Sequence, residues 1–213
     1  MPQDSDHATN PASNSSLFNV HIASSFQARF LALNHIDGFR AWTFYPGMLF
    51  RSVERWWGGG GERAAPHEGI DLCFYPNVRG ESLTVQSGME VPSPYDGFVV
   101  STVDDFIGQS VFMRHTHLSK PGFHLYTLFG HTEPQPNVKP GSEIKEGHVI
   151  AKIADAHARH RRVQSHLHIT QAWIDDTMPF EAIVWERITD KRIVLIDPLT
   201  VLRLAHVVQE TQG

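Results

Sequence analysis

Short apolar segments separated by turn signals fill the middle of the chain and constrain its fold more than any other feature. Each apolar run is four to six residues long and is bounded by pairs such as Asp-Gly, Pro-Gly or Glu-Gly. Strands at this spacing are typical of antiparallel architectures, whereas βαβ units would need helical stretches between them. We therefore predict a mainly β protein whose antiparallel sheets form an open groove. The runs are Phe98 to Val103, Val111 to Arg114, Leu125 to Phe129 and Val149 to Ile153.

The chain divides by composition into a core domain with extensions. Residues 1–16 are polar and are predicted to be a disordered tail. Residues 17–62 turn apolar and aromatic, and Phe26, Phe30 and Leu33 fit a helical stripe. We expect this segment to be a short helix and loop that packs on the core and ends in a glycine hinge at 58–61. The β domain is assigned to residues 63–204, and residues 205–213 to a C-terminal tail.

Composition excludes several classes of protein. A formal net charge of -5 disfavours a nucleic-acid partner, because phosphate binding needs concentrated Lys and Arg. No apolar run approaches the length of a membrane span, and the first 30 residues show no export signal. We therefore expect a cytoplasmic protein, or one exported by a non-classical route. The single cysteine, Cys73, forbids an intramolecular disulfide and is predicted to be a small buried core residue.

Paired histidines near residue 167 are the first sign of chemistry. On an extended strand His166 and His168 point to the same face, while Leu167 and Ile169 point into the core. Two neighbouring imidazoles are a common binding site for a transition metal. The plainer interpretation is an edge strand that carries histidines by chance.

A second group, His67 and Asp71, makes a metal site the stronger interpretation. Catalytic zinc takes three protein ligands from His, Asp or Glu and leaves a fourth position to water. The spacing of His67 and Asp71, with Gly69 letting the backbone bend between them, lets both converge, and Glu68 is expected to face away. His168 or His166 completes the set, and the other is free to move protons. His131, at the end of a predicted strand, is a further candidate.

From about Pro66 to Leu202 the chain resembles the lysostaphin-like, or LytM-type, zinc endopeptidases, which cut peptide bonds in bacterial cell walls. The resemblance lies in the two metal motifs around His67 and His168, in the strand that runs to His131, and in several turns. The segments concerned are His67 to Leu72, Ser165 to His168, Tyr126 to His131, Val91 to Gly97, Val138 to Ile153 and Ile196 to Leu199.

The resemblance implies a fold, a cofactor and a set of roles. It implies a duplicated hybrid-motif fold with one Zn²⁺ per chain bound by His67, Asp71 and His168. It implies that His166 acts as general base and that His131 stabilises the tetrahedral intermediate, although the two roles are interchangeable. The substrate is then a peptide, most simply a stem peptide or cross-bridge of peptidoglycan.

The chain departs from the family pattern in the loops that decide specificity. The stretch from Asp155 to Gln164 is charged and lacks the usual glycines, and we expect it to be a loop. Residues 175–194 look like an insertion. A second His-x-His, His115 and His117, follows another strand, and we expect His115 to be a core residue or to support the site without binding metal.

Two other functions remain open at this point. A non-catalytic binding or regulatory member of the same fold would be expected to lose metal ligands, which this chain keeps. A phosphocarrier or lipoyl-like module would explain the glycine-punctuated hairpins between Val138 and Ile153. Asp71 beside His67 argues against a phosphocarrier, because a carboxylate repels phosphate, and no Met-Lys-Met tip is present.

Overall fold

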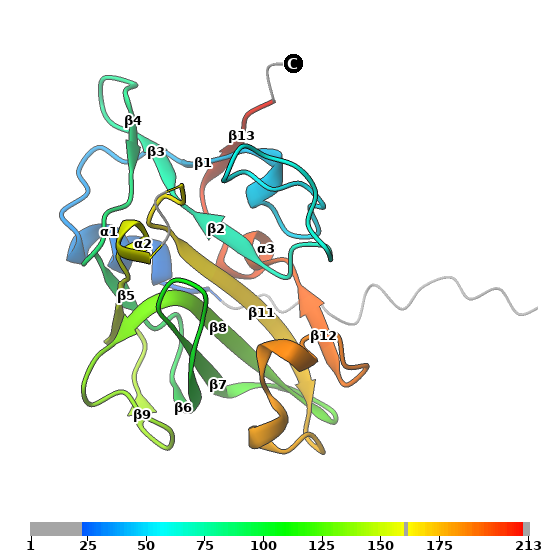
Figure 1. Ribbon diagram of the computed structural model, residues 1–213. Coiled ribbons are helices and arrows are strands. Elements are labelled where there is room, and N and C mark those ends of the chain that lie inside the picture. The colour runs from blue at the N-terminus through cyan, green and yellow to red at the C-terminus, as the bar shows by residue number, and fades with distance from the viewer. Residues whose placement is uncertain (1–22, 160–161, 211–213) are drawn as a thin grey trace, which may run out of the picture.

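The computed structural model describes residues 23–159 and 162–210 and consists mainly of strands (Figure 1). The larger sheet has the order β12-β11-β8-β7-β6-β9, with β2 paired to β11 and β10 paired to both β8 and β5. Its pairs are antiparallel, so the predicted mainly β fold with open antiparallel sheets is confirmed. Its strands are β2 (Ile70–Leu72), β5 (Glu90–Pro92), β6 (Gly97–Asp104), β7 (Gln109–Lys120), β8 (Phe123–Pro134), β9 (Glu143–Ile144), β10 (Val149–Ile153), β11 (Leu167–Asp175) and β12 (Ile193–Ile196).

A smaller sheet and several short helices complete the fold. This sheet has the order β13-β1-β3-β4, and its β1–β13 pair is parallel. Its strands are β1 (Trp42–Phe44), β3 (Phe74–Pro76), β4 (Ser82–Thr84) and β13 (His206–Val208). The helices are α1 (Phe26–Leu33), α2 (Ala156–Arg159) and α3 (Pro198–Leu202), with 3-10 turns η2 (Pro46–Met48), η3 (Phe180–Ala182) and η4 (Trp185–Arg187).

The first and last described elements both pack on the sheets. Residues 206–208, predicted to belong to a tail, form β13 and pair with β1 because the backbone of 42–44 offers an open edge. At the other end, Phe26 and Phe30 of α1 are fully buried, and the Phe26 ring stacks on Phe129 at 6.4 Å. The helix therefore shares the main core. The predicted disordered tail 1–16 lies outside the described residues.

The two faces of β8 and β11 belong to different apolar clusters. Side chains at 125, 129, 167, 169 and 173 enter the main core, as the alternation of a strand requires. The opposite face, with Leu128 and Ile174, packs on Met178 and Ile183 of the predicted insertion. His168 and Thr170 lie on this second face of β11, so the 175–194 segment covers the sheet next to them.

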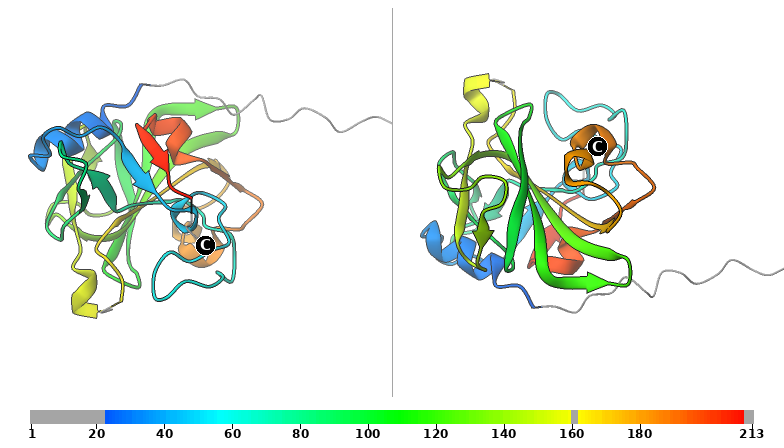
Figure 2. Two further views of the ribbon diagram at one scale, coloured as in Figure 1. Left: turned by 90° about the horizontal axis from the view of Figure 1, so that it is seen from above. Right: turned by 90° about the horizontal axis from the view of Figure 1, so that it is seen from below.

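Three connecting segments project from one side of the larger sheet. Figure 2 shows the loop before β2, the insertion that carries η3 and η4, and α2 on that same side. The last was predicted to be a loop, but Ala156–Arg159 forms one helical turn. The Asp155 carboxylate accepts a hydrogen bond from the backbone N–H of His157, as a residue that caps the start of a helix does. The many histidines and arginines of this stretch had favoured a loop.

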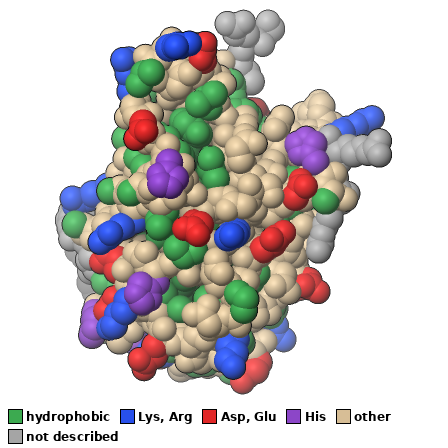
Figure 3. All heavy atoms as spheres, turned by 90° about the vertical axis from the view of Figure 1, so that its left-hand side faces the viewer, with side chains coloured by type: hydrophobic (Ala, Val, Ile, Leu, Met, Phe, Trp, Pro, Cys, Tyr) green, Lys and Arg blue, Asp and Glu red, His purple; other side chains and the backbone are tan. Residues whose placement is uncertain are grey.

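The burial of Cys73 and the distribution of charge on the surface are those of an ordinary globular protein. Cys73 is buried in the main core, as predicted. On the face shown in Figure 3, acidic and basic side chains are interspersed among apolar ones rather than gathered by sign. Within residues 23–159 and 162–210, no helix has the length and apolar content needed to span a bilayer.

Candidate active site

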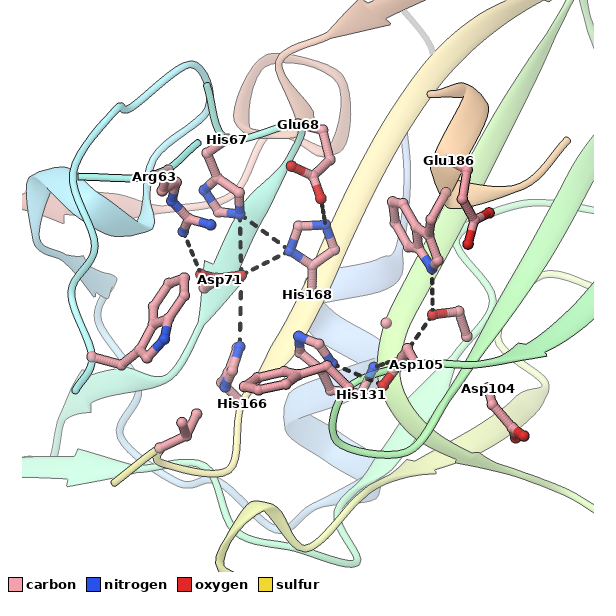
Figure 4. Close-up of a pocket in the computed structure, with 16 residues that line it drawn as sticks. Arg63, His67, Glu68, Asp71, Asp104, Asp105, His131, His166, His168 and Glu186 are labelled. Atoms are coloured by element: carbon pink, nitrogen blue, oxygen red, sulfur yellow. Dashed lines mark hydrogen bonds and ion pairs between the residues drawn. The ribbon is translucent and has the colours of Figure 1, made fainter. Parts of the chain in front are cut away.

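A cleft of about 370 Å³ opens where the loop before β2 meets β8, β11 and η4. It brings together every residue predicted for the site, although these residues come from separate parts of the chain (Figure 4). The lining residues are Trp57, Arg63, His67, Glu68, Asp71, Asp104, Asp105, Phe106, Ser110, Gly130, His131, Val163, His166, His168, Trp185 and Glu186.

His67, Asp71 and His168 converge at the base of the cleft. Asp71 and His168 are register partners in the β2–β11 pair, which brings Asp71 Oδ1 to 2.8 Å from His168 Nδ1. His67 Nε2 lies 3.2 Å from His168 Nδ1 and 3.3 Å from Asp71 Oδ1. All three side chains are buried, and one ligand atom from each lies within 4.8 Å of the others.

The outer nitrogens of the two histidines have partners that suit a metal site. His67 Nδ1 donates to the Leu49 carbonyl oxygen at 3.1 Å, so its Nε2 carries the lone pair. His168 Nε2 lies 2.8 Å from the Thr170 hydroxyl, which can accept its proton. Two imidazole nitrogens and a carboxylate oxygen then face one another. Three acceptors this close together repel one another unless a cation binds between them. Two histidines and one aspartate form a donor set that fits Zn²⁺ with one position left open.

Gly69 is needed for close approach and not for a bend. A Cβ at this position would lie 2.2 Å from the Ile169 carbonyl oxygen, so only glycine lets the chain entering β2 pass over β11. Glu68 also differs from expectation. It does not face away, because residue 68 precedes the strand, and its Oε1 lies 3.9 Å from His168 Nε2.

Two residues of the loop before β2, Trp56 and Arg63, contact the second oxygen of Asp71. Trp56 Nε1 donates to Asp71 Oδ2 at 2.7 Å, and Arg63 Nη2 lies 3.4 Å from the same oxygen. Glycines 58–61 have positive φ and turn the chain between these two side chains. The sequence analysis missed both residues, since nothing in a Trp-Trp-Gly run signals contact with an aspartate further along the chain.

His166 and His131 occupy the other wall of the cleft. Their rings are 4.8 Å apart between centroids, and His166 Nε2 lies 3.8 Å from Asp71 Oδ1. His166 Nδ1 donates to the Gln164 carbonyl oxygen at 2.7 Å, which leaves Nε2 as the proton acceptor on the cleft side. The two imidazoles not used by the donor set therefore lie beside it.

Burial and neighbouring charge tune the acids and bases of this cluster. Burial alone would raise the pKa of Asp71, but the neighbouring imidazoles of His67, His166 and His168 together hold it well below its usual value. Burial lowers the pKa of His166 to about 4, and the attraction of Asp71 only partly offsets this. Asp71 is thus an anion and His166 a neutral imidazole near neutral pH.

His115 lies away from the cleft. It is fully buried on β7, where Nε2 is 2.7 Å from Thr127 Oγ1 and the ring packs on Tyr95. This matches the expected core role. His157 is exposed on α2, and His160 lies outside the described residues.

One family of known proteins is similar to part of the chain. Residues 76–178 match the model of peptidase family M23, a segment that contains His131, His166 and His168 but begins after His67 and Asp71. Over this segment the chain is similar to the LytM/lysostaphin type of peptidases. No match was found among curated proteins.

Three solved structures are similar to the chain at low identity. The catalytic domain of a mutant of the prophage-encoded M23 protein EnpA from Enterococcus faecalis is 18% identical, with a TM-score of 0.36, over 55% of this chain and 73% of that one. Lysostaphin in solution is 17% identical, with a TM-score of 0.38, over 56% and 40%. The catalytic domain of the antimicrobial peptidase lysostaphin from Staphylococcus simulans is 16% identical, with a TM-score of 0.39, over 74% and 91%. The similarity to peptidase family M23 rests on residues 76–178 and not on these structures.

Proposed function

We propose that this protein is a zinc-dependent endopeptidase that hydrolyses peptide bonds in the stem peptides or cross-bridges of peptidoglycan. One observation carries the proposal. Donor atoms of His67, Asp71 and His168 meet within 4.8 Å in a buried corner of an open cleft. Two further imidazoles, from His131 and His166, line the same cleft.

In this proposal His67, Asp71 and His168 hold one Zn²⁺ per chain. Zinc bound there would supply Lewis-acid chemistry, lowering the pKa of a water ligand and polarising the scissile carbonyl group. The Asp71 carboxylate balances part of the charge of the ion. Its second oxygen is already engaged by Trp56 and Arg63, which leaves Oδ1 for the metal.

The remaining histidines handle protons and charge. His166 is neutral near pH 7 and directs Nε2 toward the donor set, so it is suited to take a proton from the attacking water and return it to the leaving amine. His131 would stabilise the oxyanion that develops on the carbonyl oxygen. The chemistry also works with these two roles exchanged, because both rings line the cleft.

The walls of the cleft suit a peptide that lies across the sheet. Phe106 is about half exposed at the rim, and the Trp57 and Trp185 rings add apolar surface. Glu186 and Asp104 add negative charge. An extended peptide could lay side chains against the aromatic rings while its scissile bond lies over the donor set.

The direct test is hydrolysis of purified peptidoglycan by the zinc-loaded protein. Release of new amino groups, with mass spectrometry of the fragments, identifies the bond that is cut. We expect cleavage by the wild type and none by His166→Ala, which keeps the donor set. A protein that binds one zinc and binds peptidoglycan but cuts no bond would be the non-catalytic member considered above, and the proposal would be wrong.

A further inference from the structure

We propose that Asp105 is a positioning residue that fixes the ring and the tautomer of His131, and that Ser110 and Trp185 hold Asp105 in place. The predicted insertion carries Trp185 and therefore contributes a residue to the support of the site. The inference rests on the proposed function for the role of His131. It adds residues that the sequence did not single out, and it begins with the conformation of residue 131.

His131 has an unusual backbone. Its φ is 63°, in the left-handed region that few non-glycine residues adopt. The β7–β8 register shifts at this point, between the pairs formed by Gln109 and Val111. This irregularity turns the His131 side chain toward the cleft, although regular alternation would place residue 131 on the face of Phe129. A strained, bulged residue that lines a cleft needs support from its surroundings.

Asp105 gives that support through both of its oxygens. Its Oδ2 accepts from the His131 backbone N–H at 2.8 Å, and its Oδ1 lies 3.1 Å from His131 Nδ1 (Figure 4). One carboxylate thus binds both the backbone and the ring of the same residue. The side chain of Asp105 is 7% exposed, so this contact is largely shielded from water.

The carboxylate is itself held by its own loop and by β7. The backbone N–H groups of Ile107 and Gly108 donate to Oδ1 at 2.9 and 2.8 Å. The Ser110 hydroxyl donates to Oδ2 at 2.7 Å. Burial would raise the pKa of Asp105, but the hydrogen bond and charge of His131 and these amides lower it, so it stays an anion.

Trp185 joins this network from the insertion. Its Nε1 donates to Ser110 Oγ at 2.9 Å, so the hydroxyl accepts from Trp185 while it donates to Asp105. The Trp185 ring also packs 5.6 Å from the His168 ring and 5.3 Å from Phe112. Residue 185 therefore contacts both the donor set and the residue that holds Asp105.

The chemical consequence is a fixed tautomer. An ionised carboxylate only accepts hydrogen bonds, so the proton of neutral His131 lies on Nδ1. The lone pair then lies on Nε2, at the far side of the ring from Asp105, where it can accept a proton. Of the two exchangeable roles, this tautomer suits His131 to the general base, because stabilising an oxyanion needs an N–H donor on the cleft side. A ring without this partner would exchange between tautomers and would turn about its side-chain bonds, so part of the protein would have the wrong nitrogen on the cleft side.

Asp105 could instead serve only to cap its own loop, and the experiment must separate these roles. We would compare the zinc-loaded wild type with Asp105→Asn, Ser110→Ala and Trp185→Phe. Asp155→Asn is the matched control, since Asp155 also caps backbone amides but lies outside the cleft. Long-range ¹H–¹⁵N NMR of the imidazole nitrogens, with His131 assigned by His131→Gln, reports the tautomer without any need for catalysis.

We expect the Nδ1–H tautomer in the wild type and in Asp155→Asn, and a mixture or the Nε2–H form in Asp105→Asn. With peptidoglycan as substrate, kcat should fall by about 10- to 100-fold in Asp105→Asn while KM changes little. Ser110→Ala and Trp185→Phe should lower kcat less and in the same sense. These two keep the loop contacts, so they remain informative if Asp105→Asn does not fold.

The Nε2–H tautomer in the wild type, or an unchanged tautomer in Asp105→Asn, would overturn the inference. So would a kcat for all three variants equal to that of Asp155→Asn. A wild type with the Nδ1–H tautomer but no peptidase activity would contradict the proposed function and leave the positioning role of Asp105 supported. The two failures are therefore distinguishable.

Discussion

Asp71 and His168 stand 97 positions apart in the chain, yet they face each other across the β2–β11 pair with Oδ1 and Nδ1 2.8 Å apart. The short strand β2 has three residues, and its pairing with β11 sets this distance. A metal that binds both residues ties the two strands together. Metal binding and the folding of this corner are therefore linked.

This linkage predicts that zinc stabilises the fold. Zinc at about 1,000 times its dissociation constant should add about 4 kcal/mol to the free energy of unfolding, because the unfolded chain does not hold the three donors together. Urea unfolding with zinc and with a chelator measures the difference. Asp71→Asn should show little of this zinc-dependent stabilisation. An equal stabilisation of the wild type and of this variant would rule out the linkage.

Trp56 should affect metal affinity without touching the metal. Its indole N–H holds Asp71 Oδ2, so Trp56→Phe keeps the ring but frees the carboxylate to turn. We expect zinc affinity to fall by about 10- to 100-fold. Competition with a chromophoric chelator measures it, and Trp57→Phe, which lacks the contact with Asp71, is the control. Equal zinc affinities for the two variants would show that the hydrogen bond from Trp56 to Asp71 Oδ2 does not contribute to zinc binding.

Gly69→Ala should damage the site through the backbone. The added Cβ would meet the Ile169 carbonyl oxygen at 2.2 Å, so β2 must move away from β11. We expect a loss of stability of about 1–3 kcal/mol, as for an overpacked core, together with weaker zinc binding. Urea unfolding and zinc titration measure the two effects. A variant with the stability and the zinc affinity of the wild type would show that β2 can move away from β11 without a loss of free energy.

His115 should make the protein sensitive to acid. Burial lowers its pKa to about 3, below the value of about 6.5 for an exposed histidine. The unfolded state therefore takes up the proton first, and the contribution of His115 is complete above about pH 6.5 and is lost as the pH falls toward 3. The loss can reach about 1.4 kcal/mol per pH unit.

His115→Gln removes this titration. Its free energy of unfolding should fall less steeply between pH 7 and pH 4 than that of the wild type, with both proteins measured in chelator to remove the zinc contribution. Parallel curves for the two proteins would mean that His115 is protonated in the folded state.

The sequence pattern predicted the class of fold and the members of the candidate site. Period-two alternation placed Leu167 and Ile169 in the core, and the spacing of His67 and Asp71 brought them together as expected. These features are visible because strand geometry and ligand chemistry act over a few residues. The division into domains stays a prediction.

The supports of the site were not predictable in this way. Trp56, Asp105 and Trp185 act through a few hydrogen bonds to residues distant in the chain or across a loop, and no local pattern marks such contacts. The left-handed conformation of His131 was hidden for a similar reason, because a histidine at a strand end gives no sign of a bulge. Glu68 was expected to face away, as on an alternating strand, but the strand begins only at Ile70.

The zinc content of the purified protein tests the central claim most directly. The full chain would be stripped with chelator, reconstituted with Zn²⁺, freed of excess metal and analysed by elemental mass spectrometry beside Asp71→Asn and the control Asp155→Asn. The account predicts one zinc per chain in the wild type and in the control, and well under one in Asp71→Asn. A wild type that retains no zinc, or an Asp71→Asn variant that retains a full equivalent, would contradict it.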